Sequence, residues 1–144
     1  MERMAQDVQV HLKTQVVQAG QVHNYKVDQV GQAVIMGDKI YVRYMESPEK
    51  QDNVKVIVKI ASNNQITIKR KTQNQMTTNM MFDQVHDQAF DYMTDYGMIP
   101  LVSHTNNLQV LVAQAPISGQ IKLDYSLHSG RQLVGNYKLQ LLFS

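Results

Sequence analysis

A chain of 144 residues with 43% hydrophobic and 18% charged residues has the composition of a globular protein rather than a disordered one. The absence of cysteine excludes disulfide bridges, thiolate nucleophiles and cysteine-ligated metal sites. A formal net charge of +2 falls short of the strongly basic character typical of nucleic-acid-binding proteins. The sequence shows neither an apolar signal segment nor an apolar run of about 20 residues, so we expect a soluble, cytoplasmic protein that makes no membrane contact.

Apolar and polar residues alternate with a period of two along most of the chain, which is typical of strands with one buried face. In the first run, residues 7–16, the apolar phase holds Val8, Val10, Leu12 and Val16. Further runs cover residues 25–36, 40–46, 54–60, 66–72, 76–82, 89–96, 99–105, 108–114, 117–129 and 133–143. In the last run, the alternation predicts that Leu133 shares the buried face with Tyr137.

Short turn-forming segments separate several of these runs, namely Gly37-Asp38, Ser62-Asn63-Asn64, Asn106-Asn107 and Ser129-Gly130. Connections this short join only antiparallel neighbours. Gly31, inside the second run, indicates a bulge or a sharp bend that lets the sheet curl. The helix candidate is DQVHDQAF, residues 83–90, with Asp83 as its N-cap.

These elements predict an all-β fold: an antiparallel up-and-down β-barrel of about eight to ten strands, with at most one short helix, in a single domain covering residues 1–144. A barrel removes the exposed edges that a long meander would otherwise leave. At this strand number the lumen holds either filling side chains or one small ligand.

The segment FDYMTDYGMIPLVSHTNNLQV, residues 90–110, gathers aromatic, acidic and histidine side chains in one place. We interpret it as two strands that turn at Gly97, with Asp91, Asp95 and His104 facing outward rather than forming a site. Pro100 lacks the backbone N–H that a sheet ladder needs, so the second strand is expected to be an edge or bulged there.

Four parts of the chain resemble the YwiB-like family in order and spacing: VIMGDKIYVRYMES, VKVIVKI followed by ITIKRK, DYMTDYGMIPLVSHTNNL, and GQIKLDYSL. The resemblance extends from about residue 8 to residue 143, and Tyr92, Thr94 and Gly97 are among its most characteristic positions. It implies a lipocalin-like, calycin-type barrel of the kind found in cytoplasmic proteins of Gram-positive bacteria. It brings no established activity and no functional residues. Asp95 stands where the family pattern leads us to expect proline.

Arg70 is the most informative single residue, because the alternation places its charge on the same phase as Ile66 and Ile68. A buried charge without a partner is costly, so Arg70 must be paired, reach a barrel mouth or hold an anionic group of a ligand. Arginine suits a carboxylate or phosphate because its planar fork binds two oxygens at once. The structural alternatives are that its side chain extends to water or plugs the barrel base.

Tyrosines on the apolar phases carry hydroxyls that need partners when buried. If they line the lumen, Tyr44, Tyr92 and Tyr125 would orient an amphipathic molecule together with Arg70; if they fill it, these tyrosines and Tyr137 are ordinary core. We take Arg70, Tyr44, Tyr92 and Tyr125 as the candidate ligand-binding residues.

Other constellations give weaker signals. Asp83, His86, Asp87 and Asp91 match no strong metal motif, and no catalytic group, phosphate-binding loop or cofactor motif is recognisable, so we predict no enzyme, no metal and no cofactor. Lysines at positions 55, 59, 69 and 71 form a basic stripe, which we interpret as a solvated face. Bases of a single-stranded nucleic acid stack on aromatic side chains, and here these lie mostly on the core phases. We therefore do not expect nucleic acid to be a partner.

Two functions remain open at this point. The first is a barrel that binds a small apolar or amphipathic molecule, with an anionic ligand as one case, in its lumen. The alternative is a structural or interaction protein with a filled barrel, acting through an outer face or as a homodimer, with Ile57 and Leu142 as candidate contact residues on otherwise polar phases.

Overall fold

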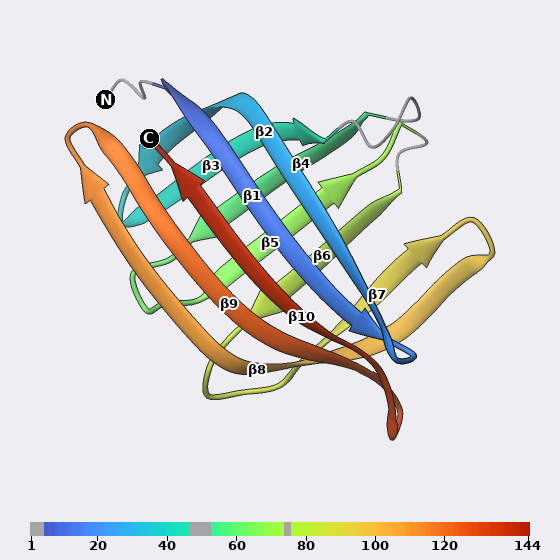
Figure 1. The fold of residues 1–144 in the computed structure, drawn as a ribbon. Coiled ribbons are helices and arrows are strands. Elements are labelled where there is room, and N and C mark those ends of the chain that lie inside the picture. The colour runs from blue at the N-terminus through green and yellow to red at the C-terminus, as the bar shows by residue number, and fades with distance from the viewer. Residues whose placement is uncertain (1–4, 47–52, 74–75) are drawn as a thin grey trace.

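The computed structural model describes residues 5–46, 53–73 and 76–144 (Figure 1). The described residues form ten strands in one sheet and contain no helix. The strands are β1 (Gln6–Gln18), β2 (Gln21–Met36), β3 (Lys39–Glu46), β4 (Val54–Ile60), β5 (Ile66–Lys71), β6 (Thr77–Phe82), β7 (Gln88–Thr94), β8 (Gly97–Gln114), β9 (Ile117–Ser129) and β10 (Gln132–Phe143). The prediction of an all-β fold with about eight to ten strands is confirmed.

The strands follow an up-and-down order in which each neighbour in sequence is also a neighbour in the sheet, except that β6 and β7 stand at the two ends. The first and last strands complete the wall, because β1 pairs antiparallel with β10 from Val10↔Phe143 to Val17↔Asn136. Side-chain bonds span the remaining seam: the Ser103 hydroxyl lies 3.2 Å from the Met81 carbonyl oxygen on β6 and 3.4 Å from the Gln88 carbonyl oxygen on β7. The sheet is therefore a nearly closed antiparallel barrel.

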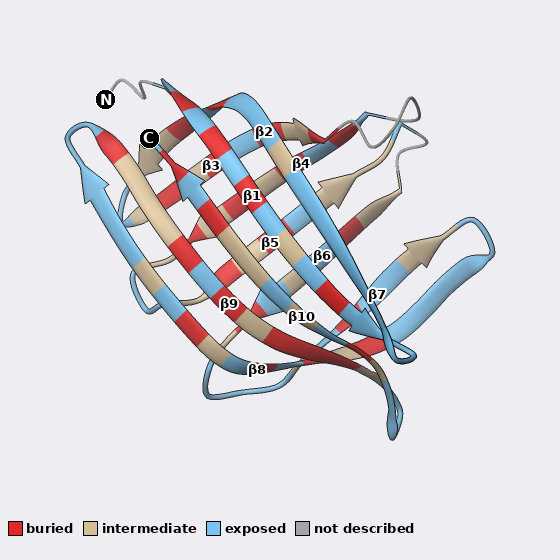
Figure 2. Cartoon of the chain, in the orientation of Figure 1, coloured by how far each residue is buried: buried red, intermediate tan, exposed pale blue. Residues whose placement is uncertain are grey.

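Burial alternates along the strands as the period-two pattern predicts (Figure 2). The largest fully buried side chains are Phe82, Phe143, Ile66, Ile121, Leu123 and Leu141. The ring centroid of Phe82 on β6 lies 4.5 Å from that of Tyr125 on β9, so side chains from separate parts of the wall meet inside the barrel. At this level the lumen is filled by core residues.

Two predicted elements are wrong, and each has a local cause. Asn106 and Asn107 do not form a turn: β8 continues through them, with a shift of pairing register on β9 between Thr105 and Asn107. The candidate helix 83–90 is instead a loop followed by the start of β7, because the Asp83 carboxylate accepts a hydrogen bond from the Val85 N–H, closing a tight turn and not the first turn of a helix.

Leu133 is a third correction, since it is 50% exposed rather than buried. The pairing of β10 with β9 shifts register between Leu133 and Gly135. One extra residue moves every preceding side chain to the opposite face of a strand, so the phase read from Tyr137 does not extend back to Leu133.

Gly31 marks a bend, as expected, but not a bulge, because its pairing with β1 is continuous. A Cβ at this position would lie 2.3 Å from the Arg43 carbonyl oxygen, so only glycine permits this approach of β2 to β3. Pairing of β2 with β3 is confined to residues from Gln32 to Met36. Among the described residues, the first half of β2 therefore has no ladder with β3 and pairs with β1 alone.

The Phe90–Val110 segment contains the predicted hairpin: β7 and β8 pair from Gln88↔Ser103 to Thr94↔Gly97. Pro100 pairs with β7 on one side, while pairing with β9 begins only at Val102, so β8 is an edge at the proline. Asp91, Asp95 and His104 are exposed, as predicted. Within the described residues, no helix has the length and apolar character needed to cross a membrane.

Candidate functional site

One end of the barrel carries a group of aromatic and charged side chains. The tips of the β1–β2, β7–β8 and β9–β10 hairpins lie at this end, away from the two chain termini (Figure 1). Strand alternation and pairing place one or two side chains from each of six strands on the inward face of the sheet at this end. We call them the mouth cluster: Tyr25, Tyr44, Glu46, Arg70, Tyr92, Tyr125 and Tyr137. Five of the chain's seven tyrosines belong to it.

Arg70 and Glu46 form the charged part of the mouth cluster. The Arg70 Nη2 atom lies 2.7 Å from Glu46 Oε2, and Nη1 lies 3.5 Å from Oε1. The glutamate side chain is 10% exposed, whereas the arginine side chain is 41% exposed. The guanidinium therefore neutralises a buried carboxylate while part of its surface remains open to solvent. Of the alternatives predicted for Arg70, the structure shows pairing at a barrel mouth.

Glu46 is the functional candidate that the sequence interpretation missed. It follows Ile40, Val42 and Tyr44 on the inward phase of β3, so the reasoning that singled out Arg70 applies to it equally. Strand register brings Glu46 near Arg70. Tyr44 and Arg70 lie opposite Val56 of β4, on its two sides, and Glu46 is the next inward residue after Tyr44.

The tyrosines connect this ion pair to the rim. Burial raises the pKa of Tyr44, and the adjacent Glu46 carboxylate raises it further. Burial also raises the pKa of Tyr125, although the nearby Arg70 guanidinium partly opposes this effect. These two phenols therefore stay neutral and can serve as hydrogen-bond donors well above neutral pH.

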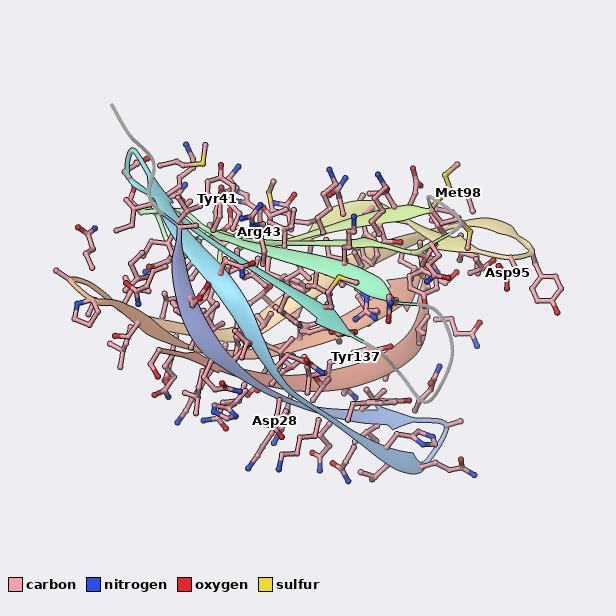
Figure 3. All side chains as sticks on the ribbon, turned by 90° about the horizontal axis from the view of Figure 1, so that it is seen from above. Asp28, Tyr41, Arg43, Asp95, Met98 and Tyr137 are labelled. Carbon is pink, nitrogen blue, oxygen red and sulfur yellow. The ribbon has the colours of Figure 1, made fainter. Side chains whose placement is uncertain are left out.

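Tyr137 lies between the inner and outer parts of the cluster. Its ring stacks on that of Tyr125, with centroids 4.8 Å apart and planes inclined by 3°. Burial raises the pKa of Tyr137, and the hydroxyls of Tyr92 and Tyr25 lie near enough to raise it further. Figure 3 shows Tyr137 between the two walls of the barrel. At the rim, Tyr92 and Tyr25 are 44% and 59% exposed.

The four residues chosen from the sequence thus lie in one region, but in different environments. Tyr44 and Tyr125 are buried, Arg70 is half-exposed, and Tyr92 lies at the rim. Tyr25 and Tyr137 join them from β2 and β10. Contact of any of these side chains with a ligand stays a prediction.

Residues 10–141 match the family described as "Domain of unknown function (DUF1934)". The chain belongs to this family. Its fold is similar to that of the crystal structure of ywiB protein from Bacillus subtilis, with a TM-score of 0.81 and 18% sequence identity over 97% of this chain and 92% of that chain. The predicted YwiB-like membership is confirmed, and at this identity the structural likeness shows the fold alone. No curated protein matches the chain at a significant level.

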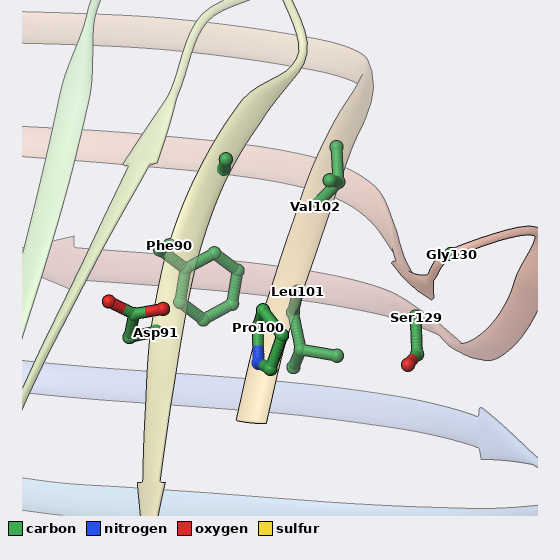
Figure 4. A pocket seen from close by; sticks show the side chains of 8 residues that line it. Phe90, Asp91, Pro100, Leu101, Val102, Ser129 and Gly130 are labelled. Carbon is green, nitrogen blue, oxygen red and sulfur yellow. The ribbon is translucent and has the colours of Figure 1, made fainter. Parts of the chain in front are cut away.

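Two surface hollows in this DUF1934 chain lie apart from the ion pair. One, with a volume of about 350 Å³, is bounded by Phe90, Asp91, Pro100, Leu101 and the turn at Ser129 and Gly130 (Figure 4). The other, of about 510 Å³, lies near the C-terminus beside Leu111, Leu142 and Phe143. Each is shallow and mostly apolar, and neither brings together a set of polar side chains aimed at a common point.

The residues weighed for metal binding do not gather at one point, although Asp83 and His86 pair with each other at 3.3 Å. The pKa of Asp83 is lowered to about 2, chiefly by the Val85 N–H and then by the Gln65 side chain. Asp87 pairs instead with His104, with 2.7 Å between the carboxylate oxygen and the ring nitrogen. Within the described parts of the chain, no group of three or more histidine and acidic side chains is placed to hold a metal ion.

The basic stripe lies on the outer face of the wall. Strand register sets Lys55 opposite Lys71 and places Ile57 between Arg43 and Lys69. Figure 3 shows Arg43 on this outer side. No outward position of β4, β5 or β6 in the described residues carries a carboxylate. Such a face attracts anions generally. The expectation that it is a solvated face and not a nucleic-acid site stays a prediction.

Proposed function

We propose that this DUF1934 protein binds a small amphipathic molecule in the cytoplasm and that the mouth cluster is the binding site. An aromatic or other apolar part of the molecule lies against Tyr92 and Tyr137, and its polar end reaches the Arg70–Glu46 pair. The proposal rests on one observation: five tyrosines lie around an ion pair whose arginine is partly exposed and whose glutamate is nearly buried. Such a mixture of apolar surface and a few convergent polar groups is typical of small-molecule sites.

The mouth is favoured over the deep lumen because Phe82 and Tyr125 meet inside the barrel. A ligand that entered this level would have to displace well-packed core rings, which is costly. At the rim, in contrast, Tyr25 and Tyr92 are already exposed and lose water favourably when an apolar surface covers them.

The Arg70–Glu46 pair also predicts which charge the polar end prefers. Glu46 is nearly buried and cannot easily turn to solvent, while Arg70 has N–H groups that the glutamate does not use. An anionic group of a ligand is therefore recognised by sharing Arg70 with Glu46. Neutralising Glu46 should strengthen anion binding, and neutralising Arg70 should weaken it.

The test uses 1-anilinonaphthalene-8-sulfonate, an aromatic anion whose fluorescence rises on binding to apolar surface. We expect Arg70→Gln to weaken its affinity about fivefold or more and Glu46→Gln to strengthen it, since the amide keeps a hydrogen bond but removes the competing charge. Lys69→Gln is the matched control, because Lys69 loses the same charge on the same strand but faces outward.

Circular dichroism and thermal unfolding show whether each variant is folded. If Arg70→Gln does not fold, the Glu46→Gln variant decides alone, provided that its thermal unfolding matches that of the wild type, because the dye also binds the apolar surface that a damaged fold exposes. The proposal is overturned if the folded wild-type protein does not bind the dye, or if affinity is the same with glutamine at position 46 as with glutamate.

A further inference from the structure

The first half of β2 is a sheet edge without a partner in the described part of the chain. From Gln21 to Val30, β2 pairs only with β1, and its pairing with β3 begins at Gln32. An unpaired edge of this length presents a row of backbone N–H and C=O groups, which is a template for pairing with another strand. Edge strands in folded proteins are usually covered or paired, so we expect this edge to pair with another strand.

The hairpin fixes which residues point their backbone groups outward. Gln18 and Gln21 flank the two-residue turn at Ala19 and Gly20, so they form a hydrogen-bonded pair, and such pairs then alternate along the ladder. The odd-numbered residues of β2 therefore bond to β1. The outward N–H and C=O groups belong to the even-numbered residues, which from Gln32 onward pair with β3.

We infer that this edge pairs antiparallel with the same edge of a second copy, about a two-fold axis at Val27. This register places outward-bonding residues opposite one another, Lys26 against Asp28 of the second copy and Asn24 against Val30. Each directly opposed hydrogen-bonded pair exchanges two backbone bonds, so the four pairs across the axis supply about eight. The partner is a second copy because this strand is complementary to itself: with the axis at Val27, its own lysine and aspartate oppose each other, as a two-fold interface requires.

Charge selects this register over its neighbours. With the axis at Val27, Lys26 meets Asp28 twice, once on each side. Moving the axis by one residue, to Lys26 or to Asp28, places two lysines or two aspartates directly opposite each other. Opposite charges across a strand pair are stabilising and like charges are destabilising. The outward placement of Asp28 is visible in Figure 3.

Two apolar residues of this edge, one on each face of the strand, are also exposed. Val30 is 63% exposed and Tyr25 is 59% exposed, although both lie in the middle of a strand. In the paired register Tyr25 lies opposite Gln29, and Val27 meets Val27 of the second copy. Pairing covers these side chains in part, which adds a hydrophobic contribution to the backbone bonds. This edge replaces Ile57 and Leu142 as the expected contact of a homodimer.

The test exchanges the two charges and measures the mass of the particle by light scattering over a concentration series. We expect the wild-type protein to be a dimer at high micromolar concentration. Lys26→Asp places an aspartate against Asp28 of the second copy, and Asp28→Lys places a lysine against Lys26, so each variant alone should dimerise about tenfold more weakly or worse. Mixed together, the two variants should form a heterodimer, because every opposed pair is then of opposite charge.

Lys122→Asp is the matched control, since Lys122 is exposed on β9 opposite Gln109 and Gln140 and makes the same charge change away from the edge. It should leave dimerisation unchanged. Circular dichroism confirms that each variant keeps its strands, which matters because Asp28 pairs within its own chain with His11 and, at 3.5 Å, with Lys26. The inference is overturned by a monomeric wild-type protein, by equal effects at positions 122 and 26, or by variants that do not associate when mixed. The dye test stays distinguishable from this one, because its variants change Glu46 on β3 and Arg70 on β5, away from the β2 edge.

Discussion

At the scale of single residues, two polar groups on the inward phases are buried, one with a partner and one without. Glu46 is 8% exposed and has the Arg70 guanidinium within 2.7 Å. Thr105 is 5% exposed, and its hydroxyl has no hydrogen-bond partner in the described part of the chain. A paired charge can be kept at modest cost, whereas an unpaired buried hydroxyl loses the water that would have bonded it.

Thr105→Val should therefore stabilise the protein by about 1 kcal/mol, because valine has the same shape and removes the unpaired hydroxyl. The measurement is the free energy of unfolding in urea, with an unchanged dependence on urea concentration. Thr67→Val on the partly exposed outer phase of β5 controls for the general preference of strands for valine. A loss of stability at position 105 alone would show that the hydroxyl is hydrogen-bonded in solution.

At the scale of elements, the sequence predicts β3, β4 and β5 well because these strands are short and pair in unbroken register. It predicts β8 and β10 poorly because each contains a register shift, at Asn106 and at Val134. Two consecutive asparagines favour a turn locally, yet β9 pairs with β8 on both sides of Asn106 and keeps the strand continuous. The candidate site follows the same rule. Alternation reveals an inward Arg70, but only strand register reveals Glu46 as its partner.

The bend in β2 offers a test at this scale. Gly31→Ala should destabilise the fold by about 1–3 kcal/mol, because a Cβ there would lie 2.3 Å from the Arg43 carbonyl oxygen and the backbone must move. Urea unfolding measures the loss. Gly135→Ala is the comparison, since its Cβ would lie 3.2 Å from the Val17 carbonyl oxygen and a smaller shift relieves it. Equal effects at the two positions would contradict a special role for the bend at Gly31.

At the scale of the whole molecule, backbone hydrogen bonds hold most of the described barrel wall together but not the seam between β6 and β7. Backbone ladders join every strand from β6 through β1 and β10 to β7, whereas no ladder joins β6 to β7 in the described residues. Ser103 spans this seam, because its hydroxyl lies within hydrogen-bond distance of carbonyl oxygens on both strands. The Met93 N–H adds a 3.4 Å bond to the Thr78 hydroxyl. We expect opening of the barrel to start at this seam and not at the β1–β10 ladder.

Ser103→Ala tests this view of closure. The serine side chain is buried, and its single O–H is shared between two carbonyl oxygens, so its loss should cost about 1–3 kcal/mol of folding free energy. Because the contact of Ser103 with Met81 ties β8 to β6 across this one seam, hydrogen exchange should speed up mainly at the amides of β6 and β7, while amides of β1 and β10 keep their protection. Ser126→Ala is the control, since that hydroxyl is also buried but bonds to His128 on its own strand. Uniformly faster exchange across all strands in Ser103→Ala would mean that the barrel opens as one unit and that the seam has no separate stability.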